Sequence, residues 1–368
     1  MSSLNTNTNI LILGKSGVGK SALLNYMLDE DAAKIGHGKP TTGEGIHKCK
    51  PFHYRGISFT VYDSWGLEAD KEKKWREIIE SETHKNDAKE MKDWFHSVVY
   101  CVDAERARVE DFEICQILRP LIDAGNRILF VLTKSALSPD NTKKTASVLH
   151  SAFPDSACIA VESVAAKLYG RTTVQQGREA LLQHFFRNFW DNIIHKTIYK
   201  YEKNAIKNFR IQFTSSVLRY FDEKAGSLGI FTHYGEEFRD DIVAFAKGML
   251  MTILSEESLK LKKNISEAQN LVAEVVHALD AKTGIDFVPD AFNDSVHKHF
   301  STNWDNSFAE YLATIVVSLL PFGIFFKKDI YESVILKACA KVNDLTEAAI
   351  KCQCRSLRQH YGVKAEKN

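Results

Sequence analysis

The sequence has little net charge and lacks the patterns of a secreted, disulfide-linked or zinc-binding protein. Its 48 Lys and Arg residues are balanced by 47 Asp and Glu residues, and no dense basic block indicates nucleic acid as a partner. The seven cysteines have neither the even number of a disulfide framework nor the paired spacing of zinc ligands. We expect Cys352 and Cys354, in a helical pattern, to be structural. Residues 1–9 form a polar leader without an apolar segment, so we expect a cytoplasmic protein.

Long apolar runs are also scarce, although the segment 311–326 in the second half of the chain carries no charge. It is shorter than the roughly 17 to 25 residues that span a bilayer, and Pro321 and Gly323 would bend it. The favoured interpretation is a buried helix, because a long helical domain needs such a core segment. The alternative is a shallow hairpin at a membrane surface, with Lys327 and Lys328 at the headgroups. In that case the protein would be peripherally membrane-associated.

The first half of the chain has the pattern of an α/β domain. Short apolar runs alternate with amphipathic stretches from residue 10 to about 175, as in a parallel sheet with crossover helices. The candidate strands are residues 9–13, 46–54, 57–62, 97–102, 127–132 and 158–161. We therefore predict a domain over 10–175 with a mostly parallel six-stranded sheet.

The second half of the chain has a helical pattern. Beyond Gly177, apolar residues recur every three to four positions. This spacing predicts long helices at 178–225 and 235–282, shorter helices around 290–301 and 304–320, and a final helix near 328–360. We expect residues 178–368 to form an all-α effector domain.

The stretch LILGKSGVGKSALLN, residues 11–25, places three glycines and two lysines between a predicted strand and a predicted helix. Its pattern Gly14-x-x-x-x-Gly19-Lys20-Ser21 is that of a phosphate-binding loop, in which glycines let consecutive backbone N–H groups converge on phosphate oxygens. The helix N-terminus behind the loop adds a positive dipole. The sequence therefore predicts that this loop binds the phosphates of a nucleotide.

Three further motifs follow along the chain. The segment DSWG, residues 63–66, ends a predicted strand, where an aspartate can hold magnesium through a water and a glycine N–H can sense a terminal phosphate. The segment GKPTTGEG supplies Thr41 and Thr42 in a loop long enough to move, so that one hydroxyl could complete the metal shell. Thr133 and Lys134 follow the fifth strand, where a base-recognition loop would lie.

Residues 9–175 resemble the translation-factor-like (TRAFAC) class of P-loop GTPases through GKSGVGKS, PTT, DSWG and TKSA. They look like bacterial Era-like and dynamin-like G domains. The chain also resembles the septin-related GTPases of the chloroplast import receptor and immune-associated families, which share a lysine in the second position of the loop, here Lys15. The resemblance implies GTP and GDP as substrate and ligand, Mg²⁺ as cofactor, and hydrolysis of the β–γ phosphoanhydride of GTP.

The resemblance also implies roles for single residues. Lys20 would contact the outer phosphates. Thr42 would be the switch threonine, with Thr41 as second choice, and Gly66 would belong to the second switch. These three residues, Lys20, Thr42 and Gly66, are the candidate catalytic residues. The metal ligands would be Ser21, Thr42 and Asp63. The nucleotide contacts would be Gly14, Lys15, Ser16, Gly17, Val18, Gly19, Lys20, Ser21, Ala22, Thr133, Lys134, Glu162 and Ser163.

One departure from the family pattern concerns the base. The family's motif ends in an aspartate whose carboxylate accepts hydrogen bonds from guanine, but this chain has Ala136. Glu162, after the sixth strand, is the candidate replacement, with Lys134 stacking its stem on the base. Asp140 is a second candidate, although its place after Pro139 suits a helix N-terminus better. The alternative for Glu162 is an ordinary solvated charge at a strand end.

A second departure concerns hydrolysis. Leu67 directly follows DSWG, where Ras-like enzymes position water with a glutamine. Leucine has no side-chain donor or acceptor, so we expect slow turnover that rises when G domains pair in a homodimer or when a partner binds. Glu68, Ser16, Arg106 and Arg108 are candidate contributors, although a surface role is more usual for such arginines.

Three functions stay open at this point. The favoured one is a cytoplasmic GTPase that hydrolyses GTP slowly and couples its nucleotide state to a helical domain. A dynamin-like membrane-associated GTPase would use the segment 311–326 to bind lipid. A nucleotide-binding scaffold with negligible hydrolysis would also account for Leu67 and Ala136.

Overall fold

The computed structural model describes residues 7–28, 44–54, 57–68, 71–106, 109–165, 167–168, 171–225, 231–233, 236–278, 310–312, 314, 317 and 325–361. These residues divide into two compact units, each described by itself below. The first unit contains the described residues up to Lys196 together with 267–278. The second contains 197–266 and the described residues from 310 to Tyr361.

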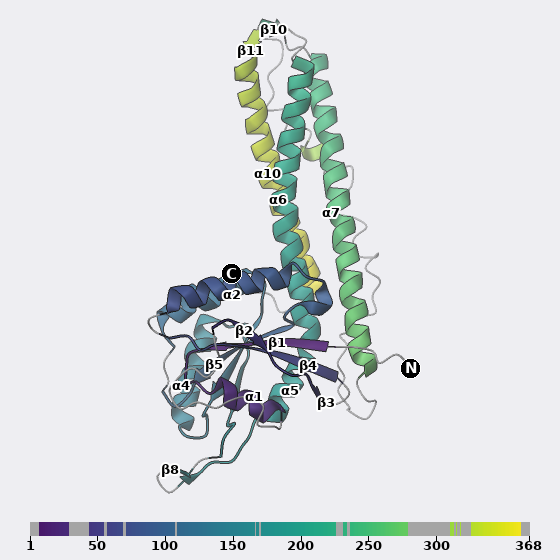
Figure 1. The fold of residues 1–368 in the computed structure, drawn as a ribbon. Coiled ribbons are helices and arrows are strands. Elements are labelled where there is room, and N and C mark those ends of the chain that lie inside the picture. The colour runs from purple at the N-terminus through teal and green to yellow at the C-terminus, as the bar shows by residue number, and fades with distance from the viewer. Residues whose placement is uncertain are drawn as a thin grey trace. The chain divides into compact units, whose positions relative to one another are not determined.

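The first unit is built around a mostly parallel β-sheet (Figure 1). Its described strands are β1 (Asn7–Gly14), β2 (Ile46–Lys48), β3 (Phe52–Tyr54), β4 (Ile57–Ser64), β5 (Ser97–Asp103), β6 (Ile128–Thr133) and β7 (Cys158–Val161). Their order is β2-β4-β1-β5-β6-β7, with β3 also paired to β4. The strands β1, β4, β5, β6 and β7 are parallel, whereas β2 and β3 run antiparallel to β4. The predicted α/β fold class is confirmed.

The predicted strand at 46–54 is divided into β2 and β3. Between them, the backbone N–H of Cys49 still donates to Val61 O at 2.8 Å. Pro51 has no N–H to donate to a strand ladder, and β3 begins directly after it. The sheet therefore has seven described strands where the sequence predicted six.

Helices cover both faces of this sheet. The helical segments of the first unit are α1 (Lys20–Leu28), α2 (Glu72–Asp87), the 3₁₀ helix η1 (Met91–Asp93), the π-helix η2 (Glu113–Leu118), α3 (Arg119–Asp123), α4 (Pro139–Ala152) and α5 (Arg178–Arg187). The short strands β8 (Lys167–Leu168) and β9 (Arg171–Thr172) form a separate antiparallel pair. On one face, Leu13 of β1, Phe130 of β6 and Trp75 of α2 share a buried core. On the other face, Phe59 of β4 packs against Phe186 of α5, with ring centroids 5.3 Å apart. Burial on both faces explains the continuous apolar runs at 10–13 in β1 and 128–132 in β6.

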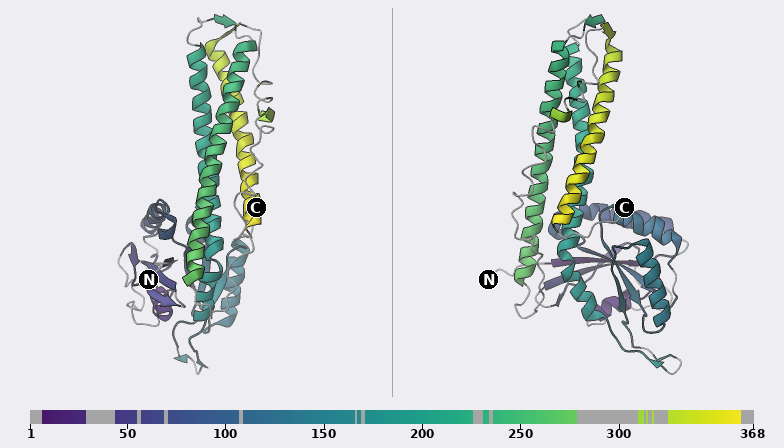
Figure 2. Two further views of the ribbon diagram at one scale, coloured as in Figure 1. Left: turned by 90° about the vertical axis from the view of Figure 1, so that its right-hand side faces the viewer. Right: turned by 180° about the vertical axis from the view of Figure 1, so that it is seen from behind.

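The second half of the chain is mainly helical, as predicted. The second unit contains the larger parts of α6 (Phe189–Ala225) and α7 (Glu236–Ala278) and all of α10 (Lys328–His360), together with the antiparallel pair of β10 (Phe231–His233) with β11 (Phe325–Lys327), which was not predicted. The three helices run side by side within this unit (Figure 2). Tyr220 of α6 stacks on Phe245 of α7 at 4.0 Å between ring centroids, and Phe221 of α6 lies 5.9 Å from Tyr331 of α10. Aromatic contacts thus join α6 to both other helices.

The apolar periodicity predicted some helix ends correctly and others not. The final helix spans 328–360, as predicted. The predicted helix at 178–225 is interrupted at Asn188, which separates α5 from α6. Apart from 310–312, 314 and 317, the predicted helices at 290–301 and 304–320 lie outside the described residues, as does most of the segment 311–326. Within the part of the chain that the structure describes, no helix is both long and apolar enough to cross a membrane.

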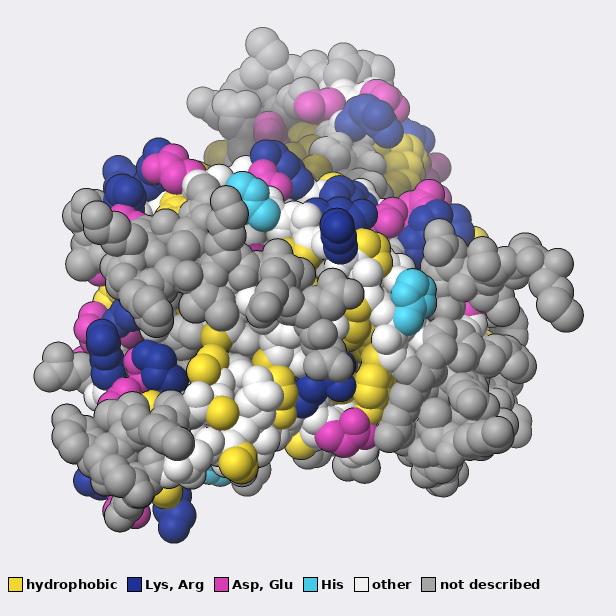
Figure 3. Space-filling view, turned by 60° about the horizontal axis from the view of Figure 1, so that its bottom comes forward, with side chains coloured by type: hydrophobic (Ala, Val, Ile, Leu, Met, Phe, Trp, Pro, Cys, Tyr) yellow, Lys and Arg dark blue, Asp and Glu magenta, His cyan; other side chains and the backbone are white. Residues whose placement is uncertain are grey.

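Charged side chains of both signs are interspersed on the face shown in Figure 3. Lysines and arginines alternate there with aspartates and glutamates, in line with a net charge of +1. All seven cysteines are free thiols. Cys352 is exposed and Cys354 is buried on α10, and among the described residues no group of three or more His, Cys, Asp or Glu could hold a metal ion.

Candidate functional site

The predicted site residues meet at one edge of the parallel sheet. The five parallel strands end there at Gly14, Ser64, Asp103, Thr133 and Val161. In parallel sheets, ligands bind in the crevice beyond the carboxyl ends of the strands. The phosphate loop, the DSWG segment and the two candidate base loops each follow one of these ends.

The phosphate loop has a backbone conformation that depends on glycine. The φ angle is +143° at Gly14, and Gly17 and Gly19 also have positive φ, a region that L side chains rarely adopt. A Cβ on Gly14 would lie 2.6 Å from Cys101 O of β5. The loop ends where α1 starts at Lys20, so the free N–H groups of the first helical turn lie next to it.

Lys20 is buried within the phosphate loop. Its Nζ donates to Gly14 O and to Lys15 O, each at 3.0 Å, and only 7% of the residue is exposed. Burial lowers the pKa of Lys20, while the negative charge of Asp63 at the end of β4 opposes this shift. A cation in such a low-dielectric site attracts anions more strongly than one in water. This is the environment expected of a phosphate contact.

The DSWG segment is hydrogen-bonded directly to the phosphate loop. Ser16 N donates to Leu67 O at 2.9 Å, and Leu67 N donates to Gly14 O at 3.2 Å. A Cβ on Gly66 would lie 2.5 Å from Ser16 Cα, so this approach requires glycine. Leu67 itself is 4% exposed, and it brings no polar side-chain atom to the site.

Lys15 directs its side chain toward η2. Its Nζ lies 2.7 Å from the carboxylate of Glu113 and 3.1 Å from that of Glu110. Glu113 is 3% exposed and also accepts hydrogen bonds from Tyr100 OH at 2.6 Å and from Glu110 N at 3.0 Å. Burial lowers the pKa of Lys15, but the two carboxylates raise it by more, so that the pKa lies above its ordinary value. Lys15 therefore anchors the phosphate loop to a π-helix, a rare conformation that is frequent at functional sites.

Thr133 and Lys134 connect the first candidate base loop to the phosphate loop. Thr133 Oγ1 hydrogen-bonds to Val18 O. Lys134 has φ +53°, which is uncommon for a residue other than glycine. Its Nζ donates to Asp103 Oδ2 at 2.6 Å and to Gly17 O at 3.3 Å. Lys134 thereby holds together the loops that follow β1, β5 and β6.

Glu162 lies beside Ala136, the residue that replaces the family's aspartate. Its Oε2 accepts a hydrogen bond from Ala136 N at 3.0 Å, and 3% of the residue is exposed. Burial raises the pKa of Glu162, while the N–H groups of Ala136 and Val164 and the charge of Lys134 lower it. The carboxylate of Glu162 is therefore buried between the two candidate base loops and is not a solvated charge at a strand end.

The other candidate residues are placed as follows. Ser21 and Ala22 follow Lys20 in the first turn of α1. Ser163 is buried after Glu162, and its carbonyl accepts a hydrogen bond from Gln175 at 2.8 Å. Asp140 lies in the first turn of α4, which agrees with its interpretation as a residue of a helix N-terminus. Outside the described residues lie Thr41, Thr42 and Arg108.

Asp103 and Glu113 also lie at the site, although neither was predicted from the sequence. Asp103 ends β5 as Asp63 stands near the end of β4, and this strand-end position is the signal that would have identified it. Arg106, an earlier candidate, is an exposed partner of Asp103 at 3.7 Å. Glu113 lies in a stretch rich in acidic residues, and no pattern in the sequence distinguishes it from its neighbours.

Comparison with known proteins agrees with this site. Residues 9–134 match the model of a family described as 50S ribosome-binding GTPase. The GTPase Der of Acinetobacter baumannii is 30% identical over 129 residues, which are 35% of this chain and 26% of that protein. The chain thus spans about a quarter of the length of the curated relatives that it matches.

Solved structures also align with about half of the chain. Toc33 from Arabidopsis thaliana in complex with Mg²⁺ and GMPPNP has a TM-score of 0.37 and 16% identity, covering 49% of this chain and 83% of that one. The G domain of the FeoB iron transporter of T. maritima has a TM-score of 0.31 and 16% identity, covering 49% of this chain and 96% of that one.

The family match, the phosphate loop and the parallel sheet define the class of this part of the chain. Residues 9–134 match a GTPase family model and have the phosphate loop and parallel strands of a P-loop G domain. A helical region follows this domain along the chain.

Proposed function

We propose that this protein binds GTP and GDP with Mg²⁺, hydrolyses GTP slowly, and couples its nucleotide state to its helical second half. The observation that carries the proposal is the buried Lys20, which lies among the carbonyls of the phosphate loop. In this proposal, residues 10–175 are the G domain and 178–368 the effector domain, after a polar leader at 1–9. The proposed location is the cytoplasm.

The residues near Lys20 fit a magnesium ion. Ser21 offers a hydroxyl from the first turn of α1, and Asp63 offers a carboxylate from the end of β4. Both are hard oxygen donors, and Mg²⁺ usually takes only one or two protein carboxylates together with phosphate oxygens and water. Bound there, the ion would neutralise charge on the outer phosphates. Thr42 remains the proposed third ligand.

Slow hydrolysis is proposed from Leu67. Its side chain is buried and apolar at the position where a water-orienting amide is expected, and its backbone is occupied by the bonds to Ser16 and Gly14. The chain itself therefore supplies no water-orienting group at this position. We propose that pairing of two G domains in a homodimer, or an activating partner, supplies it.

Guanine recognition is proposed for Glu162. Guanine presents two adjacent donors, N1–H and the exocyclic amine, which a carboxylate can accept together. One oxygen of Glu162 is bonded to Ala136 N, so the carboxylate lies where the base loops meet. Adenine has an acceptor at N1, which the carboxylate would repel.

Titration calorimetry with Mg²⁺ and a non-hydrolysable GTP analogue tests the nucleotide site. Ser21→Ala should lose the magnesium-dependent part of binding, and chelating the metal should bring wild-type protein to the same affinity. Lys144→Ala, at an exposed position of α4, is the matched control and should bind as wild type does. Wild-type affinity in Ser21→Ala with magnesium present would contradict the proposed metal site. A phosphate-release assay then distinguishes slow hydrolysis from a scaffold that only binds nucleotide.

A further inference from the structure

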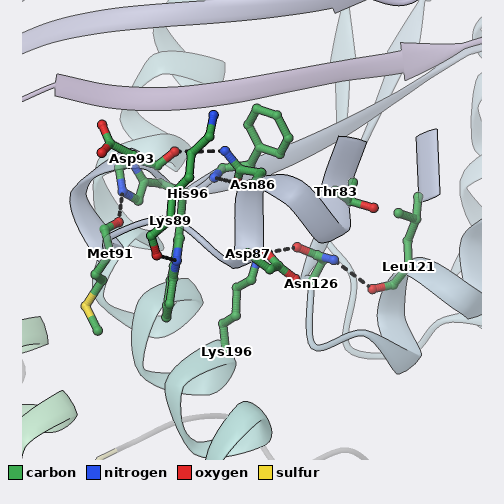
Figure 4. A network of polar contacts seen from close by, with 12 residues as sticks. Thr83, Asn86, Asp87, Lys89, Met91, Asp93, His96, Leu121, Asn126 and Lys196 are labelled. Atoms are coloured by element: carbon green, nitrogen blue, oxygen red, sulfur yellow. Dashed lines mark hydrogen bonds and ion pairs between the residues drawn. The ribbon is translucent and has the colours of Figure 1, made fainter. Parts of the chain in front are cut away.

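An ion pair between a buried lysine and a partly exposed aspartate joins α6 to the helix that follows the DSWG segment (Figure 4). Lys196 of α6 has 4% of its side chain exposed, and its Nζ forms an ion pair with Asp87, the last residue of α2. The same Nζ donates to Asn126 Oδ1 at 3.0 Å and lies 5.5 Å from the ring centroid of Trp94. Asn126 in turn donates to Leu121 O at 3.0 Å. Lys196 is therefore held by several segments of the first unit at once.

This junction ties the first two turns of α6, which belong to the first unit, to the end of α2. Burial lowers the pKa of Lys196, while the charge of Asp87 and the hydrogen bond to it oppose the shift. A buried charge that loses its partner is strongly destabilised, so Lys196 and Asp87 cannot separate without cost. Lys196 also lies at the C-terminal end of α2, where a cation interacts favourably with the helix dipole.

A second set of contacts fixes the same ends of α2 and α6. Asn86 of α2 donates to Asp93 O at 2.8 Å and accepts a hydrogen bond from Phe95 N at 2.6 Å. Asn192, one turn before Lys196 on α6, donates to His96 O at 3.0 Å. The end of α2 and the beginning of α6 thus share the segment 93–96.

The other end of α2 is attached to the second switch. Trp75, in the first turn of α2, donates from Nε1 to Trp65 O at 2.9 Å, and both rings are buried. Trp65 belongs to DSWG, and two residues later Leu67 bonds to the phosphate loop. One continuous helix of 16 residues therefore connects the phosphate site to Lys196.

We propose that α2 transmits the nucleotide state of the DSWG segment to α6, with the junction of Asp87, Lys196 and Asn126 as the output contact. This inference rests on the proposed nucleotide binding and extends it. A displacement of DSWG that accompanies the third phosphate moves Trp65, the bonded α2 follows, and Asp87 passes the displacement to Lys196. From Thr197, α6 belongs to the second unit. Because coupling between two sites is reciprocal, a partner that binds the helical half would change nucleotide affinity through the same junction.

Hydrogen exchange of the full chain, read by mass spectrometry, tests the junction. Exchange is compared between protein with Mg²⁺–GDP and protein with Mg²⁺ and a non-hydrolysable GTP analogue. In wild type, peptides from α2 and from the first half of α6 should both differ between the two nucleotides, by at least about fivefold in exchange rate. In Lys196→Met, the difference should remain in α2 and disappear in α6. The control Lys207→Met changes an exposed lysine of the same helix and should behave as wild type.

Two further variants keep the test decisive if Lys196→Met does not fold. Lys196→Arg keeps the charge and should keep the nucleotide-dependent difference in α6, whereas Asp87→Asn removes the ion pair and should reduce it. A difference in α6 that persists in Lys196→Met, or one that is undiminished in Asp87→Asn, would overturn the inference. The inference would also be overturned if wild-type protein bound nucleotide and its exchange rates changed in α2 but not in α6. That result would leave the proposed function standing. Absence of nucleotide binding in calorimetry would refute both.

Discussion

Replacing Lys20 with methionine separates the cost of burying this lysine from its role in binding. Burial lowers the pKa of Lys20 below the ordinary value of 10.5, so at neutral pH the charged side chain makes the nucleotide-free fold less stable. This cost fades only as pH rises from the lowered pKa toward 10.5. Methionine removes the charge, but it also removes the bonds to Gly14 O and Lys15 O, worth about 1 kcal/mol each.

The two effects oppose each other, and we expect the stability of nucleotide-free Lys20→Met to stay within about 2 kcal/mol of wild type, which is the size of the two lost hydrogen bonds. For a domain of this size that corresponds to a change of at most about 4 to 8 °C in melting temperature. Wild type should gain about 2.7 kcal/mol from Mg²⁺–GTP at a hundred times its dissociation constant. The variant should gain far less, because losing one charge-assisted hydrogen bond weakens binding by about 10- to 150-fold. Thermal unfolding with and without Mg²⁺–GTP measures both effects. A variant several kcal/mol less stable than wild type, or one that Mg²⁺–GTP stabilises equally, would refute the reasoning.

Three other predictions concern groups near the site and in the core. Glu113→Gln should weaken nucleotide binding about 3- to 10-fold in calorimetry by releasing Lys15. Adding Lys15→Met to this variant should weaken binding no further, and affinity losses that add up in the double variant would contradict the coupling of the two residues. GTP turnover per molecule should rise with protein concentration because Leu67 orients no water, and a rate that stays flat from nanomolar to high micromolar protein would argue against paired G domains. Burial lowers the pKa of His96 to about 4, so the unfolded chain takes up a proton first as pH falls. This group should therefore remove about 3 kcal/mol of stability between pH 6.5 and 4, and urea unfolding of His96→Asn with an unchanged pH dependence would speak against it.

The sheet could be predicted because its strands are buried on both faces. Such strands appear in sequence as continuous apolar runs, and the runs at β1, β5 and β6 fall close to their observed bounds. The division at Pro51 was missed because an apolar pattern carries no information on ladder hydrogen bonds. The break at Asn188 was missed for a similar reason, since buried aromatic residues continue on both sides of it.

The phosphate loop could be predicted because its chemistry depends on local spacing. The direction of the Lys15 side chain could not, because it depends on Glu113, which the fold brings from almost a hundred residues away. Likewise, periodicity does not distinguish buried Lys196 from exposed Lys207 on α6. The order of the loops identified Glu162 as the candidate replacement for the missing aspartate. Its contact with Ala136 was not predicted, since it requires the two strand ends to be neighbours in the sheet.

The central claim, a guanine-specific nucleotide site, is tested most directly by competition of GTP against ATP for wild-type protein and for Glu162→Ala, with magnesium present. If the carboxylate reads the base, wild type should prefer GTP by about 10- to 150-fold, because a hydrogen bond to a charged group contributes about 1.5 to 3 kcal/mol. Glu162→Ala should then bind the two nucleotides almost equally, with binding through the phosphates retained. Equal GTP/ATP ratios in the two proteins would contradict the role of Glu162, and a wild type without preference would contradict guanine specificity itself.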